Sequence, residues 1–316
     1  MKSDEKKMFI TGGAGFIGSR LTNHLLGEGF KVLVFDNLSV GRRSFLNNNK
    51  NLKFIKGDIL NKKLLSGSVK DFSPNFLIHL AAIHFIPLCN KYPIKTVENN
   101  IIGTKNVLEA AKRSGINLKK VLIASSGAVY YGCKEKEHKE EKDLMPTEMY
   151  SYSKYVNELQ LRHFYNITGI NSAAMRFFNV YGPNETNPHL FPAIFSQLKS
   201  GRSTLVIGNP KPKRPYIFVD DIVNAITMII KLPKKGFEAY NIGSDKEYSA
   251  AEVINIISGL VGKKLKFKSD PSLIRKEDVI HFKPSLTKIK KEIGWWPKYD
   301  IKKGLSKLLE EEKVQL

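Results

Sequence analysis

Residues 8–18 read MFITGGAGFIG, and this stretch decides how the rest of the chain is interpreted. Its apolar start predicts a β-strand, and the glycines that follow predict a tight turn opening into a helix that runs through Leu26. In that order, strand, turn and helix let backbone N–H groups approach a pyrophosphate at the helix N-terminus. The stretch therefore predicts a dinucleotide site. Its candidate binding residues are Gly12, Gly15, Phe16, Ile17 and Gly18.

Apolar, strand-like runs recur outward from this turn. They lie at 31–36, 52–58, 76–82, 121–126 and 171–180, and helical patterns separate them, including 93–114 and 147–168. Strands separated by helix-sized crossovers predict parallel βαβ units that are covered by helices on both faces. The expected fold class is α/β, with a Rossmann-type doubly wound parallel sheet.

The pattern of the sequence changes after Tyr181. Six prolines fall within 182–216, so loops are expected to dominate there, and helical patterns return at 220–231, 250–261 and 301–312. We expect residues 1–178 to form the dinucleotide-binding domain. Residues 179–316 should form mainly a smaller, loop-rich substrate domain, interleaved with segments that return to the sheet.

The composition limits the classes of protein to which the chain can belong. With 316 residues and 42% hydrophobic residues, the chain can bury a sizeable core. The net charge of +21 comes mostly from lysine, because only nine of the 51 basic residues are arginine. Scattered lysines are typical of a solvated surface, so no nucleic-acid partner is expected. Two cysteines, a polar start and no long apolar run predict a soluble, reduced, cytoplasmic protein without a membrane partner.

The acidic residue Asp36 ends the second predicted strand, 18 residues after Gly18. A carboxylate at that place accepts hydrogen bonds from the adenosine ribose and repels a 2′-phosphate. This predicts NAD rather than NADP as the cofactor. Arg42 and Arg43 lie nearby and argue in the opposite direction.

The motif Tyr-x-x-x-Lys places a phenol and an ammonium one helical turn apart, where the cation stabilises a phenolate. Three pairs occur, at Tyr130/Lys134, Tyr150/Lys154 and Tyr299/Lys303. The first runs into a turn, and the third lies near the chain end. Tyr150 starts a predicted helix and follows Ser126, at the end of the fifth strand, by 24 residues. Tyr150 and Lys154 are therefore the predicted catalytic pair.

The chain resembles the extended short-chain dehydrogenase/reductase family, in its NAD-dependent sugar-nucleotide epimerase/dehydratase group. The resemblance covers residues 8 to about 310. The matching stretches are TGGAGFIG (11–18), DNLSVGRR (36–43), GDI (57–59), HLAA (79–82), NNIIGT (99–104), SSGAVY (125–130), YSYSK (150–154), RFFNVYGP (176–183), KRPYIFVDD (213–221), YNIG (240–243) and LTKIKKEIGWWP (286–297).

This resemblance implies roles for residues that the motifs alone do not assign. Tyr150 becomes the acid/base tyrosine, Lys154 its lysine, and Ser126 the group that holds the reacting sugar oxygen. The cofactor would also contact Asn37, Asp58, Ile59, Leu80, Ala81, Ala82, Asn99 and Phe178. The substrate's diphosphate and ribose would contact Asn179, Arg214, Arg275 and Asp278. A surface arginine at 275 and a buried capping asparagine at 179 are the alternative interpretations.

The two residues after Ser126 bear on the reaction. Dehydratases of this group usually carry an acidic pair there, and decarboxylases a Glu, whereas this chain has Gly127 and Ala128. The resemblance therefore implies a 4-epimerase of the UDP-glucose/UDP-galactose type, acting on a nucleotide-diphosphate sugar. A 4-keto reductase, dehydratase or decarboxylase is the alternative, and a non-catalytic NAD-sensing or RNA-associated protein a remote one. The segment 84–93 departs from the family pattern and leaves the sugar open.

Two further expectations concern assembly and metals. The helices at 93–114 and 147–168 match those that pair two subunits in the family, so a homodimer is expected. The seven histidines show no metal-ligand spacing, and no metal site is expected. His79 and His84 are taken as packing or loop residues, and Glu158 as a solvated or salt-bridged residue.

Overall fold

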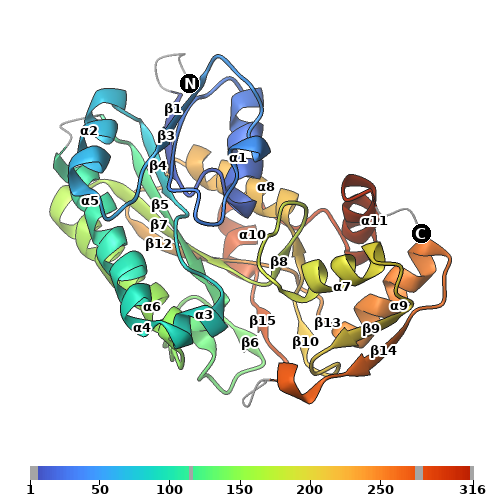
Figure 1. The fold of residues 1–316 in the computed structure, drawn as a ribbon. Coiled ribbons are helices and arrows are strands. Elements are labelled where there is room, and N and C mark those ends of the chain that lie inside the picture. The colour runs from blue at the N-terminus through green and yellow to red at the C-terminus, as the bar shows by residue number, and fades with distance from the viewer. Residues whose placement is uncertain (1–5, 114–116, 275–279, 314–316) are drawn as a thin grey trace.

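A seven-stranded parallel sheet forms the centre of the computed structural model, which describes residues 6–113, 117–274 and 280–313 (Figure 1). From one edge to the other the strand order is β12-β7-β5-β4-β1-β2-β3, and every neighbouring pair is parallel. This is the predicted Rossmann-type α/β fold. The strands are β1 (Lys7–Thr11), β2 (Lys31–Asp36), β3 (Leu52–Lys56), β4 (Phe76–His79), β5 (Lys120–Ser126), β7 (Asn171–Phe177) and β12 (Phe237–Ile242).

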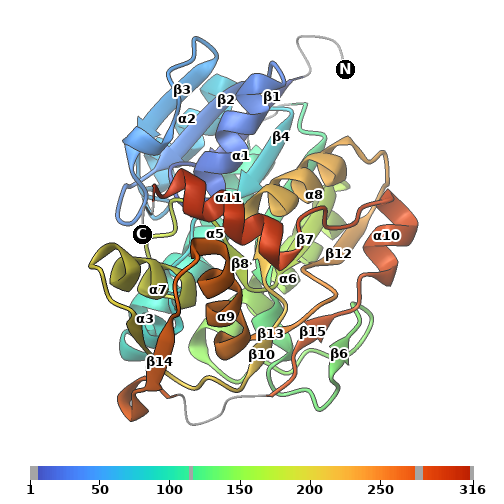
Figure 2. The same ribbon diagram turned by 90° about the vertical axis from the view of Figure 1, so that its right-hand side faces the viewer.

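Helices cover both faces of this sheet, which explains why its central strands are continuous apolar runs. On one face, Met8 and Ile10 of β1 share a core with α1 (Phe16–Gly27), α8 (Val219–Lys231) and α10 (Thr287–Ile293). On the other, Phe9 shares a core with α2 (Lys62–Phe72), α5 (Gly103–Arg113) and α6 (Met149–Thr168). Figure 2 shows α1 and α8 together on one side of the sheet.

The second half of the chain builds a separate core beyond the carboxyl ends of the strands (Figure 1). It contains α7 (Leu190–Lys199), α9 (Ala250–Val261) and α11 (Ile301–Glu311). The prediction that loops dominate 182–216 is wrong for 190–199, because Pro192 falls in the first turn of α7, where its missing N–H is not needed. The short strands here are β9 (Thr204–Ile207), β10 (Lys213–Arg214), β11 (Ile217–Phe218), β13 (Tyr248–Ser249) and β14 (Lys266–Ser269).

Several elements end earlier than the sequence predicts. β3 ends at Lys56 and β4 at His79, so both are shorter than the predicted strands at 52–58 and 76–82. The sixth predicted strand stops at Phe177, and Asn179 has a positive φ of 24° before β8 (Val180–Tyr181) resumes. The strand breaks there because the backbone turns out of the sheet, a conformation that asparagine tolerates better than most residues.

The predicted helix at 93–114 is one helical path with three geometries. It starts as α4 (Pro93–Thr96), continues as a π-helical segment at Val97–Ile102, and ends as α5. A π-helical segment is rare and is often found at functional sites. The remaining short elements are α3 (Ile86–Lys91), β6 (Glu137–His138) and β15 (Lys283–Pro284).

The strand order reverses between β1 and β4, which neighbour each other while their connections lead to opposite sides of the sheet. In open α/β sheets the crevice beyond such strands binds ligands. Among the residues described, no helix combines the length and the apolar character that a membrane span requires.

Candidate active site

The glycine-rich turn follows β1 at this crevice, and its shape depends on the absence of side chains. Gly12 has a φ of +70°, and a Cβ atom there would lie 2.6 Å from the backbone nitrogen of Ala81. A Cβ atom on Gly18 would lie 2.0 Å from the carbonyl oxygen of Gly12. Helix α1 begins directly after Gly15, so its unpaired N–H groups face the crevice. The turn therefore fits a dinucleotide pyrophosphate, as predicted from its sequence.

Asp36 links the end of β2 to this turn. One carboxylate oxygen accepts from the backbone N–H of Ala14 at 2.9 Å, and the other accepts from that of Leu38 at 2.8 Å. Each oxygen keeps capacity for a ribose hydroxyl, because a carboxylate offers about four acceptor sites. Next to it, the Asn37 amide donates to Asp58 at 2.9 Å. The predicted ribose and adenine residues thus form one continuous rim.

The two arginines beside this rim contact their own loop. The Arg43 guanidinium lies 5.5 Å from the centre of the Phe54 ring and donates to the carbonyl oxygen of Leu46 at 3.2 Å. The guanidinium of Arg42 lies 5.8 Å from the centre of the Phe45 ring. Both arginines are partly engaged by these aromatic contacts.

The opposite wall of the crevice follows β4. The N–H of Leu80 donates to the carbonyl of Thr11 at 3.0 Å, which holds residues 80–82 beside the glycine turn. Behind them, His79 is bonded through its two ring nitrogens to the hydroxyls of Thr11 at 2.6 Å and Thr104 at 2.8 Å. Burial lowers the pKa of His79 to about 3, so the ring is neutral and packs inside the protein.

The catalytic residues predicted from sequence come together at the end of β5. The Ser126 hydroxyl accepts from the N–H of Ala128 at 3.1 Å, which caps the 3₁₀ turn Gly127–Tyr130, and it lies close to the phenol of Tyr150. Tyr150 lies in the first turn of α6, and the Lys154 Nζ is 5.7 Å from the centre of its ring. The ammonium donates to the carbonyl oxygen of Ala124 at 2.8 Å. Serine, tyrosine and lysine thus form one cluster.

Burial opposes charge on both members of the pair. It raises the pKa of the Tyr150 phenol above its ordinary value, and the nearby hydroxyl of Ser126 partly offsets this effect. It also lowers the pKa of Lys154 to about 8. A buried ammonium beside a phenol favours proton loss from the phenol, and any further positive charge near the ring would strengthen this effect.

The other two Tyr-x-x-x-Lys tyrosines lie elsewhere. Tyr130 is fully buried, and its hydroxyl donates to the amide oxygen of Asn241 at 3.0 Å. Tyr299 packs in the second core, with its ring centre 4.9 Å from that of Phe218. Of the three, Tyr150 is the one whose phenol lies close to the Ser126 hydroxyl.

A buried ionic network beneath the serine turn is the main feature that the sequence analysis missed. Glu158 is 4% exposed and accepts two hydrogen bonds from the Arg176 guanidinium, at 2.9 and 2.7 Å, and a third from the hydroxyl of Ser125. Arg176 also donates to the hydroxyl of Tyr130. Of the two roles expected from the sequence, solvated or salt-bridged, Glu158 therefore has the second, and its salt bridge is buried. Its spacing of four residues from Lys154 already places both on one helix face.

A second missed residue is Asn100, in the π-helical segment. Its amide oxygen accepts from the N–H of Ile83 at 2.8 Å, and its amide nitrogen donates to the Ile83 carbonyl at 2.8 Å and to Ser153 at 3.1 Å. The neighbouring candidate Asn99 donates to Asn100 at 2.9 Å. These bonds join the loop after β4 to the helix that carries Tyr150.

The remaining candidates are distributed around this cluster. Phe178 is 1% exposed, and a Cβ atom on Gly127 would lie 2.8 Å from its ring, so Phe178 packs behind the serine turn. Asn179 follows it with its positive φ, and Arg214 lies on β10. Ile59 is 4% exposed, in the core that contains α5. Arg275 and Asp278 lie outside the described residues.

The segment after β8 reaches back to the loop after β4. The Asn187 amide nitrogen and the Nε2 atom of His84 are 2.8 Å apart, and His189 forms an ion pair with the buried Glu185. Burial lowers the pKa of His84 to about 4, so its ring is neutral. These side chains line the region where the loop 84–93 departs from the family pattern.

Comparison with known proteins agrees with this geometry. Residues 8–243 match the model of the NAD dependent epimerase/dehydratase family. The chain is 32% identical to UDP-glucose 4-epimerase of Mycolicibacterium smegmatis, over 96% of this chain and 97% of that protein. It is 31% identical to UDP-glucuronate 4-epimerase of Thermodesulfobacterium geofontis, over 94% and 93%.

A solved structure shows the same fold over the whole chain. UDP-glucose 4-epimerase of Thermotoga maritima, crystallised with UDP-glucose, superposes with a TM-score of 0.87 at 29% identity and covers 97% of this chain and 98% of that one. The glycine turn, the serine–tyrosine–lysine cluster and these matches lead to one conclusion: the chain belongs to the NAD-dependent epimerase/dehydratase family of the extended short-chain dehydrogenases/reductases.

Proposed function

We propose that this protein is an NAD-dependent 4-epimerase of nucleotide-diphosphate sugars, of the UDP-glucose/UDP-galactose type. The serine turn carries this proposal. Elimination and decarboxylation in the family are expected to need a carboxylate directly after the serine, and this chain has Gly127 and Ala128 there. Because the Phe178 ring lies 2.8 Å from the position of a Cβ atom on Gly127, a longer side chain does not fit without displacing that ring.

The residues around the glycine turn fit NAD, which is the cofactor we propose. The turn and the N-terminus of α1 would hold the pyrophosphate, and Asp36 the adenosine ribose. Asn37, Asp58 and Ile59 would border the adenine, and residues 80–82, Asn99 and Phe178 would border the rest of the cofactor. When bound, NAD supplies the acceptor and donor of the sugar's C4 hydride.

Within this site each member of the catalytic cluster has a separate task. Tyr150 removes the proton from the C4 hydroxyl and returns it after the sugar has turned over. Ser126 holds the C4 oxygen near Tyr150, which the closeness of its hydroxyl to that phenol supports. Lys154 stabilises the phenolate through its positive charge.

Inverting C4 requires that the diphosphate stays fixed while the sugar rotates. We propose that residues 179–316 form mainly the substrate domain and hold the diphosphate in place. Within them, Asn179 and Arg214 would contact the diphosphate. Arg275 and Asp278 are proposed to complete it at the diphosphate and the nucleotide ribose. An arginine fork suits phosphate oxygens.

The names of similar proteins support nucleotide-diphosphate sugars as the class of substrate, but they are compatible with more than one reaction on that substrate. UDP-N-acetylglucosamine 4-epimerase of Methanobrevibacter ruminantium has a TM-score of 0.88 at 28% identity, covering 99% of each chain. However, UDP-glucuronic acid decarboxylase 1 of Xenopus tropicalis is also 28% identical, over 98% of this chain and 72% of that protein. The second candidate function is therefore a different reaction on the same class of ligand.

The decisive experiment incubates the protein with a panel of nucleotide sugars and follows C4 configuration by NMR, without added NAD. An epimerase interconverts the two C4 epimers with no net consumption of cofactor. A 4-keto reductase would instead consume NADH stoichiometrically, and a decarboxylase would release carbon dioxide. Either of the latter results would replace the epimerase proposal.

The preference for NAD over NADP is tested at Asp36. Asp36→Ala is expected to weaken NAD binding and to reduce discrimination against NADP, because the carboxylate that repels a 2′-phosphate is removed. Titration of each cofactor by fluorescence measures both effects. Tighter binding of NADP than of NAD by the unmodified protein would contradict the assignment.

We also propose that two copies pair through α5 and α6. These helices border a surface groove that contains Leu108 and Phe164, and Leu159 and Ile167 on it are 47% and 46% exposed. Light scattering at micromolar concentration should show a dimer, which Leu159→Glu weakens. Leu273→Glu, at a 57% exposed leucine in the other half of the chain, is the control and should leave the dimer intact.

A further inference from the structure

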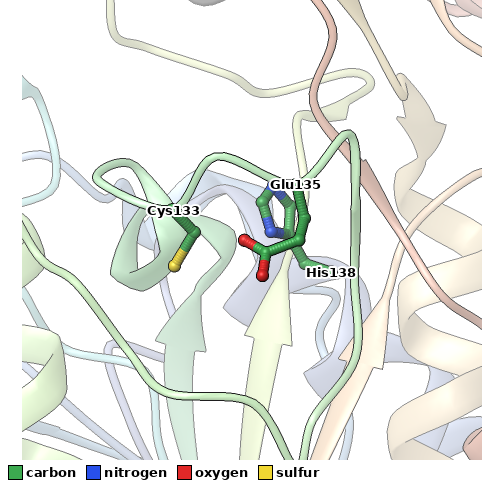
Figure 3. Close-up of side chains that lie close together, drawn as sticks. All are labelled: Cys133, Glu135 and His138. Atoms are coloured by element: carbon green, nitrogen blue, oxygen red, sulfur yellow. The ribbon is translucent and has the colours of Figure 1, made fainter.

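Three different metal-binding side chains converge on the loop between the serine turn and α6. They are Cys133, Glu135 and His138, and their ligand atoms all lie within 4.8 Å of one another. Figure 3 shows the Cys133 sulfur and the Glu135 carboxylate near the imidazole of His138. The sequence analysis did not single out this set because it mixes three residue types.

The imidazole of His138 is fixed in place by its surroundings. Its ring centre lies 4.8 Å from that of Tyr130 in a stacked arrangement and 5.0 Å from that of Phe282. Its backbone carbonyl accepts from the N–H of Ser285 at 2.8 Å and from the amide of Asn241 at 2.9 Å. A ring held on two faces and by its backbone is oriented before any ligand arrives.

His138 is only 3% exposed, yet its ring nitrogens form no hydrogen bond within the described part of the chain and are not fully buried. They can therefore be reached from solvent, as an incoming cation requires.

Cys133 supplies the softest of the three ligands. Its backbone N–H donates to the carbonyl of Tyr130 at 2.8 Å, and its thiol donates to the carbonyl of Asp143 at 3.4 Å. Burial raises the pKa of this thiol, so coordination has to release its proton. A thiolate and a carboxylate together balance the two positive charges of a divalent cation.

We propose that Cys133, Glu135 and His138 form a binding site for a divalent cation of the zinc class, with water in the fourth position. Sulfur, imidazole and carboxylate ligands in one set favour zinc over magnesium or calcium, which prefer oxygen alone. In a tetrahedral zinc centre the ligand atoms are about 3.3–3.8 Å apart. The ligand atoms therefore have to approach one another by about 1 Å, and Glu135, whose side chain is exposed, is free to change rotamer toward the other two.

The expected role of this site is structural. A cation there ties Cys133 to His138 and so closes the loop that follows Tyr131, whose ring centre is 5.0 Å from that of Phe282. β6 in turn pairs with β15, so the cation would fix this loop against the second half of the chain. The cation would raise thermal stability without taking part in the proposed sugar chemistry.

Cobalt(II) is the probe, added to the reduced, full-length chain without a polyhistidine tag. One equivalent should give the absorption of a thiolate-to-cobalt charge transfer together with visible bands of a tetrahedral centre, and Zn²⁺ should bleach both. Cys133→Ser should abolish the charge-transfer band. His138→Phe should weaken binding while it keeps the stack on Tyr130 and Phe282.

Glu137→Gln is the matched control, because Glu137 is in the same loop but pairs with Lys283 at 3.6 Å. This variant should bind cobalt like the unmodified chain, and Zn²⁺ should raise the melting temperature of both, but not that of Cys133→Ser. Circular dichroism and NAD binding establish that each variant is folded. Absence of the charge-transfer band, or a band that survives in Cys133→Ser, would overturn the proposal.

Discussion

The turns after β1 and β5 lie on the same edge of the sheet, yet they are held in opposite ways. The glycine turn depends on missing side chains and on bonds to the backbone of the turn, such as the one from the Ala14 N–H to the Asp36 side chain, 22 residues away. The serine turn depends on side chains from far along the chain. Glu158 reaches Ser125 across 33 residues, and Asn241 reaches Tyr130 across 111.

This difference separates two kinds of information in the sequence. A site for a pyrophosphate needs backbone N–H groups in a fixed curve, and a short glycine-rich stretch provides them. A site for proton transfer needs a phenol, a hydroxyl and an ammonium at fixed separations in a dry environment. That requires elements from the whole sheet, joined by buried polar contacts whose loss is costly.

The largest effect is expected when the reacting hydroxyl of the serine-turn cluster is removed. Tyr150→Phe should lower the turnover rate by about 10²–10⁴, because general acid/base catalysis typically contributes that much. The fold and NAD binding should be largely retained. Steady-state kinetics on an epimerised nucleotide sugar measures the effect.

The other tyrosines of the same motif are the controls for this change. Tyr299→Phe should leave the turnover rate nearly unchanged. Tyr130→Phe should lower the turnover rate less than Tyr150→Phe does, and it should act mainly on stability because the Tyr130 hydroxyl is hydrogen bonded to Asn241. Turnover by Tyr150→Phe at the rate of the unmodified enzyme would refute the catalytic assignment.

The next largest effect is expected in the network under the serine turn. Glu158→Ala leaves the Arg176 guanidinium buried without its carboxylate, which should lower the free energy of unfolding by about 3–5 kcal/mol. Chemical denaturation measures this loss. Glu109→Ala, which breaks the exposed pair with Lys105, should cost only about 0.3–0.5 kcal/mol. Equal losses in the two variants would show that the serine turn does not depend on the buried pair.

A smaller effect is expected in the glycine turn. Gly18→Ala places a methyl group against the Gly12 carbonyl, and overpacking of this kind costs about 1–3 kcal/mol. NAD binding should weaken about tenfold to hundredfold if the turn must shift to relieve the contact. Gly27→Ala in the same helix meets no atom within 4 Å and should leave affinity unchanged. Unchanged affinity in Gly18→Ala would mean that the turn is not the pyrophosphate site.

The smallest expected effect is on how the free energy of unfolding changes with pH. The pKa of Lys154 in the folded protein is about 8, below the ordinary value of 10.5. Between pH 8 and 10.5 the unfolded chain therefore binds more protons than the folded chain. Because of this, the free energy of unfolding rises with pH over that range. Below pH 8 both states are protonated, and the cost of the buried charge is fully present. Lys154→Met should remove this part of the slope and, at pH 7, stabilise the fold because the buried charge is removed, while activity is lost. An unchanged slope would show that Lys154 is not the titrating group.

Local patterns predicted much of the fold. Strand β2 was predicted at its observed bounds, α6, α8, α9 and α11 within two residues at each end, and the end of α1 within one residue, because apolar periodicity and turn residues act over short distances. The strand β12 was not predicted individually, and neither was α7. In both cases the local pattern was weak, and the long-range partners were not visible in the sequence.

The sequence by itself determined the glycine turn, Asp36 and the pair Tyr150 and Lys154 as candidates, since they follow from short motifs and their spacing, and the family resemblance added Ser126. Only the tertiary structure decided that Ser126 lies close to Tyr150, that Glu158 and Arg176 are a buried pair, and that Cys133, Glu135 and His138 converge. The reason is physical. Burial, and the pKa shifts and polar pairing that follow from it, depend on which distant elements pack together, whereas turn geometry depends on adjacent residues.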